Sequence, residues 1–523
     1  MAADAPPAAP DPVFDADSQR LNELGYAQEL KRGLGTFSNF AISFSIISIL
    51  AGAVTTFSLG MLAGGPRMIM LGWPIVGFFS LMVGMSMAEI CSAYPTAGGL
   101  YYWTAKLAPK NGPRWAWFCG WFNLVGQIGV IASVDYALAN YVGYTIQLYH
   151  SSFALTTNTK FVIYLVLLVL HGLLNAFGVR LVKMLGDISV WWHVGGVAVI
   201  LGLLLAAPDH REGAGFVTHY VNATGWTGPF AWVYVALIGL LLAQYTITGF
   251  DASAHVSEET RDAATSAPKG IVRSIWISVV AAFIMNFAMV QAIPKGAYDR
   301  IAAGGILAGG NLFVEALGGS GGKLLVIIST LGQFFCGMAC VTAASRMIYA
   351  FSRDGAIPGH RLWHKINPGT RTPTNSIWLA VVLSALAGAL TLIQTNSGYP
   401  VAFFALTGMC VIGLYISYVI PVFQRLRSNS FVPGPWTLGK WGRPVATIAV
   451  AWVAVIAFIF CAPAFYPWDT LNTFNFTAPI VGGIILVVGI WWAVSAKRWF
   501  TGPKVQGSRE ELEAIERELS EVV

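Results

Sequence analysis

Charged residues are scarce in this chain of 523 residues. Asp, Glu, Lys and Arg make up 11% of it, whereas a soluble globular domain carries about 25%. The 31 basic and 25 acidic residues are too few to solvate the roughly three soluble domains that this length would allow. The scarcity excludes an ordinary soluble enzyme, and the 56% of hydrophobic residues points to a membrane.

Cysteine is also rare, and all six cysteines lie within apolar stretches. That placement argues against a secreted disulfide scaffold and against a paired zinc ribbon. Cys336 and Cys340 are four residues apart on one helical face, but no histidine or second cysteine pair accompanies them. A zinc-type histidine pair, a catalytic-triad spacing and a phosphate-binding loop are missing as well. The sequence therefore predicts no enzyme activity, no cofactor, no metal site and no nucleic-acid partner.

Long apolar runs, by contrast, are abundant. A bilayer core about 30 Å thick requires about 20 apolar residues in a helix. This criterion predicts twelve spans, at residues 36–62, 68–90, 116–147, 161–179, 184–207, 230–256, 271–293, 324–352, 374–394, 400–424, 444–466 and 477–498. The segments between them contain the prolines, glycines and charges that interrupt helices.

Basic residues indicate the orientation of these spans. With the N-terminus in the cytoplasm, 25 Lys and Arg residues fall on the cytoplasmic side and six on the outside. Because cytoplasmic loops carry the excess of Lys and Arg, both termini are predicted to be cytoplasmic. We expect a multi-pass protein of the plasma membrane, with the lipid bilayer as its surroundings.

Two tails flank the spans, at residues 1–35 and 499–523. The first twenty residues lack the basic start and apolar core of a signal peptide and are predicted to be a disordered tail. In the second tail, Ser508 and Glu511 match a capping box. An apolar stripe follows it, formed by Leu512, Ile515, Leu519 and Val522. We favour a short solvated acidic helix here over a regulatory docking element.

Few ionisable residues lie within the predicted spans, and each is a functional candidate because a charge in hydrocarbon is costly. They are Glu89, Asp135, His171, Asp187, His193, Asp251, His255 and Arg346. Glu89, Asp187, His255 and Arg346 lie near predicted cytoplasmic ends, where structural roles are at least as well supported as transport roles. Asp135 and His171 are on neighbouring spans, and we interpret them mainly as partners of each other.

The first and sixth spans are unusually polar at mid-depth. Residues 43–58 contain seven Ser, Thr and Gly residues, and residues 244–251 contain six polar or Gly residues. Spans five apart suggest two inverted repeats of five helices, in which the first helix of each repeat is interrupted at the membrane midplane. Half-helix N-termini attract a carboxylate, and half-helix C-termini receive an ammonium. The alternative is a Ser- and Gly-rich face that packs tightly against a neighbouring helix.

Three long motifs resemble the amino acid, polyamine and organocation (APC) transporter superfamily, and within it the amino acid and choline branch that includes GABA permeases. They are ITGFDASAHVSEET at 247–260, AEICSAYPTAGGLYYW at 88–103 and SRMIYAFSRDGAIP at 345–358. The resemblance implies an all-α integral membrane protein with a leucine-transporter-like fold. Two inverted five-helix repeats would occupy 36–207 and 230–424, and two additional C-terminal helices would occupy 444–498.

The same resemblance implies a substrate site at the two helix breaks. It places the first break at Ser48, Ile49, Leu50, Ala51 and Gly52, where many relatives have two glycines and this chain has one. It places the second break at Tyr245, Thr246, Ile247, Thr248 and Gly249, with Tyr245 as an aromatic lid over the substrate. Side-chain specificity would come from neighbouring helices, through Asn123, Gln127 and Gln333; the alternative role of these amides is to hold helices together.

The resemblance also suggests how the carrier could be energised. Proton-coupled bacterial relatives have a lysine in the fifth helix where sodium-coupled members bind their ion, and His193 occupies that position here. Histidine titrates near physiological pH, so His193 is a candidate proton site; the alternative is a neutral histidine bonded to a carbonyl of the first or eighth span. Asp251 is the second candidate, with capping of the half-helix that begins there as its competing role.

We therefore expect a secondary active transporter of amino acids, with GABA or a neutral amino acid as substrate, alternating access and H+ as the coupling ion. The alternatives are a choline or polyamine carrier, or an amino acid exchanger of the same fold. A major facilitator carrier is disfavoured because the connection at 257–270 is short and carries Glu258 and Glu259. A channel would require a continuously open lining. The pattern specifies no oligomeric state.

Overall fold

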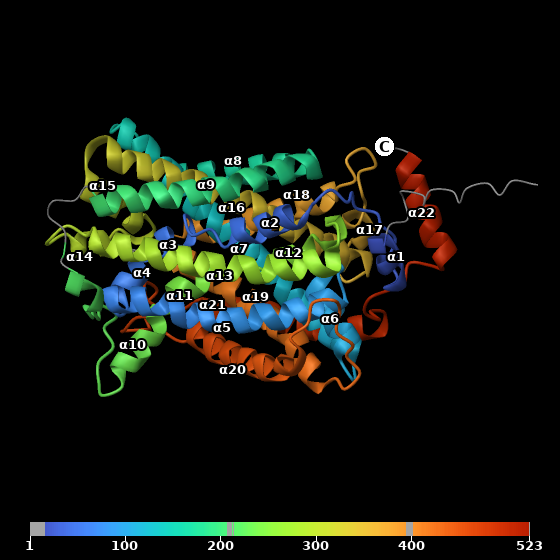
Figure 1. The fold of residues 1–523 in the computed structure, drawn as a ribbon. Coiled ribbons are helices and arrows are strands. Elements are labelled where there is room, and N and C mark those ends of the chain that lie inside the picture. Colours follow the sequence, from blue (N-terminus) through green and yellow to red (C-terminus); the bar gives the residue numbers. More distant parts are fainter. Residues whose placement is uncertain (1–15, 207–211, 213, 394–400, 522–523) are drawn as a thin grey trace, which may run out of the picture.

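The computed structural model describes residues 16–206, 212, 214–393 and 401–521. These residues form an elongated bundle of helices that run roughly parallel to one another (Figure 1). Ten helical segments are long and apolar enough to cross a membrane. They are α5 (Gly65–Ala93), α7 (Gly112–Tyr149), α8 (Thr157–Ala176), α9 (Val179–Ala206), α13 (Ala263–Gln291), α16 (Gly319–Arg353), α18 (Thr374–Gly388, extended to Leu392), α19 (Val401–Arg427), α20 (Gly442–Cys461) and α21 (Thr477–Val494).

The two remaining predicted spans, 36–62 and 230–256, are each divided into shorter helices. The first contains α2 (Thr36–Ile46), α3 (Gly52–Thr55) and α4 (Phe57–Leu62). The second contains α10 (Ala231–Gly239), α11 (Leu241–Thr246) and α12 (Ala252–His255). Both interruptions predicted from the polar residues are therefore present. The twelve-span count and the inverted repeat stay predictions.

Shorter helices lie at the two ends of the bundle (Figure 1). At one end, called the α22 end below, are α1 (Ala16–Glu23), α6 (Gly99–Leu107), α17 (His360–Trp363) and α22 (Arg509–Glu521). At the other are α14 (Tyr298–Ala302) and α15 (Ala308–Leu317). Several were not predicted, because each is shorter than a membrane span and is flanked by Gly or Pro.

Helices α7 and α19 form the centre of the bundle. They pack against each other, and α7 also contacts α16, α6 and α8. In each of the two central helices 83% of the most apolar window is buried inside the protein, against 17% in α21. The small side chains Gly126 and Gly413 allow the α7 and α19 backbones to approach closely, as is usual between membrane helices. Helix α21 lies at the edge, with most of its apolar surface facing outward.

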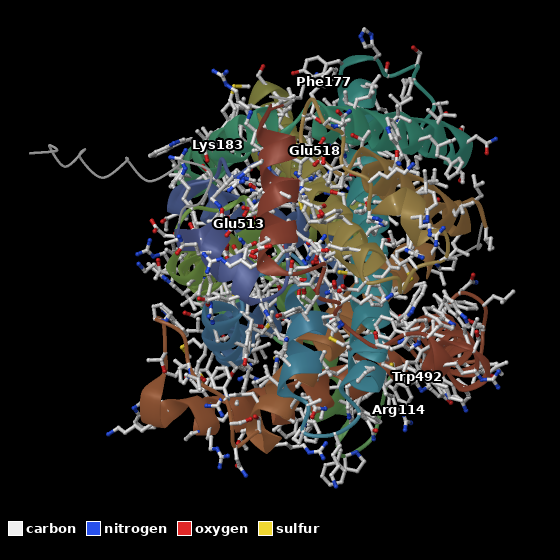
Figure 2. The ribbon with its side chains drawn as sticks, turned by 90° about the vertical axis from the view of Figure 1, so that its right-hand side faces the viewer. Arg114, Phe177, Lys183, Trp492, Glu513 and Glu518 are labelled. Atoms are coloured by element: carbon white, nitrogen blue, oxygen red, sulfur yellow. The ribbon has the colours of Figure 1, made fainter. Side chains whose placement is uncertain are left out.

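Both tails differ from the sequence-based expectation. Residues 1–15 of the predicted disordered tail lie outside the described residues, but residues 16–23 form α1, and Tyr26, Leu30 and Leu34 are buried. At the other terminus the capping box is present: Ser508 N–H donates to Glu511 at 2.7 Å. Helix α22 does not stand free in solvent as expected. It crosses the α22 end of the bundle (Figure 2), where Leu512 is buried and Glu516 accepts a bond from Gln28 N–H at 2.7 Å.

Candidate functional site

The interruption in the first span lies between Ile46 and Gly52. Ser48 closes a tight turn there, because its carbonyl accepts from Gly52 N–H at 2.8 Å. Two α16 side chains bind carbonyls on either side of the turn: Cys336 S–H donates to Ile46 at 3.3 Å, and Ser329 O–H donates to Leu50 at 2.7 Å. The break therefore falls within one residue of the predicted Ser48–Gly52 segment.

The interruption in the sixth span lies two residues later than predicted, between Thr246 and Ala252. Tyr245 and Thr246 complete the last turn of α11, and Gly249 takes a left-handed conformation with φ of 92°. That backbone angle favours glycine because a side chain there would be strained. A Cβ atom on Gly249 would also lie 2.1 Å from Ile46, so the two breaks are in direct contact.

Two tyrosines of α19 satisfy backbone groups freed by this second break. Tyr415 O–H donates to the Ile247 carbonyl at 2.5 Å, and the Tyr418 hydroxyl accepts from Gly249 N–H at 3.2 Å. In this conformation these two backbone groups bind side chains of the protein. Substrate binding at the Gly249 N–H requires the Tyr418 hydroxyl to move, whereas the Ile247 carbonyl keeps a second lone pair.

A cavity of about 20 Å³ lies between the breaks. Its lining includes seven of the predicted site residues: Ser48, Ala51, Gly52, Tyr245, Thr246, Thr248 and Gln333. A cavity of this size holds about one water molecule. Admission of an amino acid therefore requires the helices around it to separate.

The cavity walls bring together the first span, the sixth span, α7 and α16. A Cβ atom on Gly52 would lie 2.6 Å from the Thr246 hydroxyl, so the glycine permits close approach of the first and sixth spans. Gln333 of α16 donates to the Ser329 hydroxyl at 3.2 Å, while its Oε1 atom is buried without a hydrogen-bond partner. Gln333 thus presents an unused acceptor beside the cavity.

Tyr245 stands between this cavity and a second, outer one. The outer cavity is larger, about 60 Å³, and Tyr245 and Thr55 line both. The Tyr245 hydroxyl donates to Ser133 of α7 at 3.0 Å. Tyr245 therefore lies where the two cavities adjoin, and its role as a lid stays a prediction.

Several predicted substrate residues lie away from the cavity lining. Ile49, Leu50, Ile247 and Gly249 are part of the breaks without lining the cavity. Asn123 and Gln127 also lie outside it, and their amide nitrogens donate to Asp251 Oδ2 at 3.2 and 3.1 Å. These two amides hold a buried carboxyl group of the protein.

Sequence reasoning missed six residues of the cavity lining: Ile46, Thr55, Val130, Val134, Ala137 and Cys336. Val130, Val134 and Ala137 continue the helical face of Asn123 and Gln127 at intervals of three and four residues. That spacing was a usable signal. Thr55 and Cys336 show the same signal, three residues after the predicted Gly52 and Gln333. Ile46 has no such pattern, because it reaches the cavity only through the way separate helices cross.

His193, the first candidate proton site, is buried against the break in the first span. Its Nδ1 lies 2.8 Å from the Ser189 carbonyl, and its Nε2 lies 2.6 Å from the Ser48 hydroxyl. A carbonyl only accepts, so Nδ1 carries a proton, and a neutral ring then accepts the Ser48 O–H at Nε2. Every contact of His193 is satisfied by a neutral imidazole, with the Ser48 hydroxyl of the first span in place of the expected carbonyl.

Asp251, the second candidate, is fully buried at the end of the second break. It makes no side-chain capping bond to α12, so the capping role is not observed. Its Oδ1 accepts from Tyr418 O–H at 2.6 Å, and its Oδ2 lies 3.2 Å from His255 Nε2 in addition to the two amides. Asp251 therefore joins α7, α19 and α12 at one buried point.

The other buried ionisable residues have partners of their own. Arg346 binds Glu259 at 2.6 Å, and Glu89 accepts from Leu438 N–H at 3.1 Å. His171 Nδ1 lies 3.1 Å from Asp135, so these two residues pair as interpreted. Within the described residues, no three His, Cys, Asp or Glu side chains group as metal ligands, and all six cysteines are free thiols.

Comparison with known proteins adds an independent line of support. A family model described as "Amino acid permease" matches residues 34–490. A relative named amino-acid permease BAT1, from Arabidopsis thaliana, is 42% identical over 518 residues, covering 94% of this chain and 97% of its own length. A GABA-specific permease from Saccharomyces cerevisiae is 30% identical over 498 residues, covering 93% of this chain and 86% of its own length. The similarity therefore extends across both helix breaks.

Proposed function

Because the chain belongs to the amino acid permease family, we propose that it is a secondary active transporter that carries amino acids by alternating access. Transport is the function of this family, and the chain is a multi-pass membrane protein. The observation that carries the mechanism is the cavity at the contact between the two helix breaks. Opening it to one side and then to the other would move a substrate across the bilayer.

The chemistry of the cavity favours a small zwitterion. None of the described side chains that line it is charged, so carboxylate and ammonium groups would be met by half-helix termini. Gln333 Oε1 offers one additional acceptor for an ammonium group. We propose GABA or a neutral amino acid as the substrate, and the identity to a GABA-specific permease supports this choice.

Proton coupling is the second part of the proposal. His193 and Asp251 are the candidate proton sites, because both are buried beside the breaks and both change charge on binding one proton. The charge bias of 25 against six Lys and Arg residues supports a plasma-membrane protein with both termini in the cytoplasm. In this orientation the α22 end faces the cytoplasm.

Uptake into proteoliposomes tests the substrate and the coupling together. Purified protein would be given labelled GABA, alanine, leucine, choline and putrescine, each with and without an imposed pH gradient. We expect accumulation of GABA or a neutral amino acid only with the gradient. Exchange against preloaded amino acid without any effect of the gradient would instead establish an exchanger, and uptake of choline or putrescine alone would contradict the substrate assignment.

Cys336 provides a test of the binding site. Its thiol lines the cavity, so a thiol reagent that reaches it should block uptake, and bound substrate should slow the reaction. Cys336→Ser, which keeps a donor to the Ile46 carbonyl, is the insensitive control. For the coupling site, gradient-driven uptake that is unchanged in His193→Ala would remove His193 from the proposal.

A further inference from the structure

His255 lies between two oxygen atoms that can only accept hydrogen bonds. Its Nδ1 is 3.0 Å from the carbonyl oxygen of Ala97, in the connection between α5 and α6. Its Nε2 is 3.2 Å from Asp251 Oδ2. The ring is buried, and Asp251 is completely buried. Both ring nitrogens therefore face acceptors at hydrogen-bond distance, out of contact with solvent.

The two contacts of the His255 ring require two protons in total. A carbonyl never donates, so the contact with Ala97 places a proton on Nδ1. The contact with Asp251 then needs a second proton, either on Nε2 or on the carboxyl group. Tyr418, Asn123 and Gln127 all donate to the same carboxyl group. Three donors stabilise the carboxylate form, so the second proton belongs on His255.

A neutral His255 can keep only one of the two contacts. With a single ring proton it donates either to Ala97 or to Asp251, and the other contact becomes a repulsive meeting of two lone pairs. A positively charged imidazolium donates to both at once. One proton thus decides whether Ala97, His255 and Asp251 stay joined in a single chain of hydrogen bonds.

The surroundings contain few other groups that could replace this proton. Helix α2 has no titratable side chain, and Lys269 and Arg273 of α13 are exposed. Helix α7 contributes amides only, and α19 contributes the Tyr418 phenol and, at longer range, the Cys410 thiol. The arginines of α16 are paired with the acids after α12, Arg353 with Glu258 and Arg346 with Glu259.

Ala97 also connects the Asp251–His255 pair to the α22 end. Ala97 accepts from His255 through its carbonyl, and its N–H donates to Glu258 Oε1 at 2.9 Å. Glu258 in turn binds Arg353 of α16 at 3.0 Å. Ala97 is therefore held between the proton-dependent bond and an ion pair that joins the sixth span to α16. Loss of the first bond loosens the closure at this end.

We propose that Asp251 and His255 form a one-proton binding site whose protonated state holds the α22 end of the carrier closed. Release of the proton from His255 Nε2 toward that end leaves a neutral imidazole, breaks its bond to Ala97 or to Asp251, and allows the cavity to open there. This deepens the proposed function and rests on it, because it assigns the coupling proton to this pair. His193 needs no extra proton and is not the coupling site in this scheme.

The thiol of Cys336 tests the proposal without any substrate. A membrane-impermeant maleimide would be applied to each face of oriented vesicles from about pH 5 to about pH 8, and labelling at Cys336 followed by mass spectrometry. Each labelling rate is divided by the rate at Cys336 in the denatured protein at the same pH, because thiolate formation by itself raises maleimide reactivity with pH. From the face that carries α22, we expect this normalised labelling of the wild type to rise with pH, by up to about tenfold per unit as a single proton is released. Cys336→Ser supplies the background.

Two substitutions separate this pair from a general effect of buried histidines. His255→Gln removes the titrating ring, and we expect its normalised labelling to lose the rise with pH. His171→Gln alters the matched Asp135–His171 pair and should keep the wild-type profile.

Each result decides the proposal. A wild-type profile that is flat, or a His255→Gln profile that still rises as in the wild type, would overturn it, and circular dichroism of each variant would verify folding. Uptake of labelled GABA and alanine distinguishes this failure from failure of the transport proposal. If His255→Gln exchanges these amino acids but no longer accumulates them with a pH gradient, the pair is the coupling site. If the wild type moves none of the amino acids, transport itself fails, while the labelling profile still reports the proton.

Discussion

Two buried Asp–His pairs occur in this protein, and they differ in how many protons their contacts require. In the Asp251–His255 pair both ring nitrogens face acceptors, Ala97 on one side and Asp251 on the other. In the Asp135–His171 pair only Nδ1 faces the carboxyl group, at 3.1 Å, and Nε2 has no hydrogen-bond partner. A neutral His171 satisfies the second pair, whereas the first needs an additional proton.

The two pairs also differ in the helices to which they are bonded. Asp251 accepts from side chains on α7 and α19 at the break of the sixth span, so a change there reaches several helices. Asp135 and His171 join α7 to α8. The Asn175 side chain donates to the His171 and Met338 carbonyls, which fastens α8 to α16. The comparison indicates that composition alone does not make a proton site, because the second pair has the same residues and serves as a link between helices.

Truncation of each aspartate should give the largest difference. Asp251→Ala leaves the donors of Tyr418, Asn123, Gln127 and His255 without their acceptor. We expect loss of uptake and a decrease in the free energy of unfolding of about 3–5 kcal/mol. Asp135→Ala leaves one ring N–H unpaired and should cost about 1–3 kcal/mol with transport retained. Thermal unfolding in detergent and proteoliposome uptake measure both; equal losses in the two variants would erase the distinction.

Removal of one tyrosine hydroxyl beside each pair should have a smaller effect. Tyr418 bridges Gly249 N–H and Asp251, while Tyr164 donates to the Ser384 carbonyl at 2.5 Å and lies near Asp135. Tyr418→Phe should slow uptake about tenfold, the equivalent of about 1.4 kcal/mol, because the break in the sixth span loses a bond. Tyr164→Phe should slow uptake less than twofold, because the bond it removes, worth about 1 kcal/mol of stability, goes to the Ser384 carbonyl and touches neither helix break. A larger effect from Tyr164 would show that transport depends on the second pair.

A methyl group placed against each pair should act mainly on stability. A Cβ on Gly337 would lie 2.1 Å from Asp135, whereas one on Gly99 would lie 3.5 Å from the His255 ring. Gly337→Ala must push the second pair apart, at a cost of about 1–3 kcal/mol, and should leave the pH profile of Cys336 labelling unchanged. Gly99→Ala meets no clash, but its φ of 47° costs about 1 kcal/mol. An altered labelling profile in Gly337→Ala would show that the Asp135–His171 pair contributes to the proton response, which would contradict the proposal.

The C-terminal helix should produce the smallest effect, and only through the Asp251–His255 region. Gln28 links Glu258 to Glu516, because its side chain donates to the Glu258 carbonyl at 2.7 Å and its N–H donates to Glu516. Burial raises the pKa of the Glu516 carboxyl above its ordinary value. The docked tail therefore binds a proton more tightly than the free tail, so this contribution favours docking at low pH and is lost as the pH rises through the raised pKa.

Hydrogen–deuterium exchange of residues 509–519 measures this docking. After correction for intrinsic exchange, protection should decrease from about pH 4 to about pH 7 in the wild type and stay constant in Glu516→Gln. Arg509→Gln, at an exposed ion pair with Glu513, is the control. Removal of residues 504–523 should change the Cys336 labelling rate by about twofold, less than 1 kcal/mol. If protection in the wild type does not change with pH, docking of the C-terminal helix does not depend on pH.

The sequence predicted the elements of the site better than their connections. The polar residues of the first and sixth spans predicted that both spans are interrupted, because hydropathy acts along a single segment. The family resemblance placed the two breaks within one and two residues of their positions in the structure. Six residues predicted from these two spans, and Gln333 of the eighth, line the cavity. Asn123 and Gln127 were assigned to substrate, however, and they bind Asp251; their helical face was predictable, but their partner was not.

His255 shows the reason most clearly. Its place near the end of a span suggested a structural role as readily as a functional one, and nothing in the local pattern identifies Ala97, 158 residues away, as its partner. His193, by contrast, stood out in the sequence and is satisfied in the folded chain by Ser48 and Ser189. Hydrogen-bond partners depend on where separate helices cross, to within a few tenths of an ångström.

The sequence by itself determined that this protein is a helical membrane carrier with two interrupted spans and very few charges at depth. Those properties follow from hydropathy, charge bias and motifs, which are set by each segment independently of the others. Only the tertiary structure decided which charges meet acceptors on both sides. The number of protons that a buried histidine must hold depends on the atoms that other helices bring to it, and for His255 those atoms are the Ala97 carbonyl and the Asp251 carboxylate.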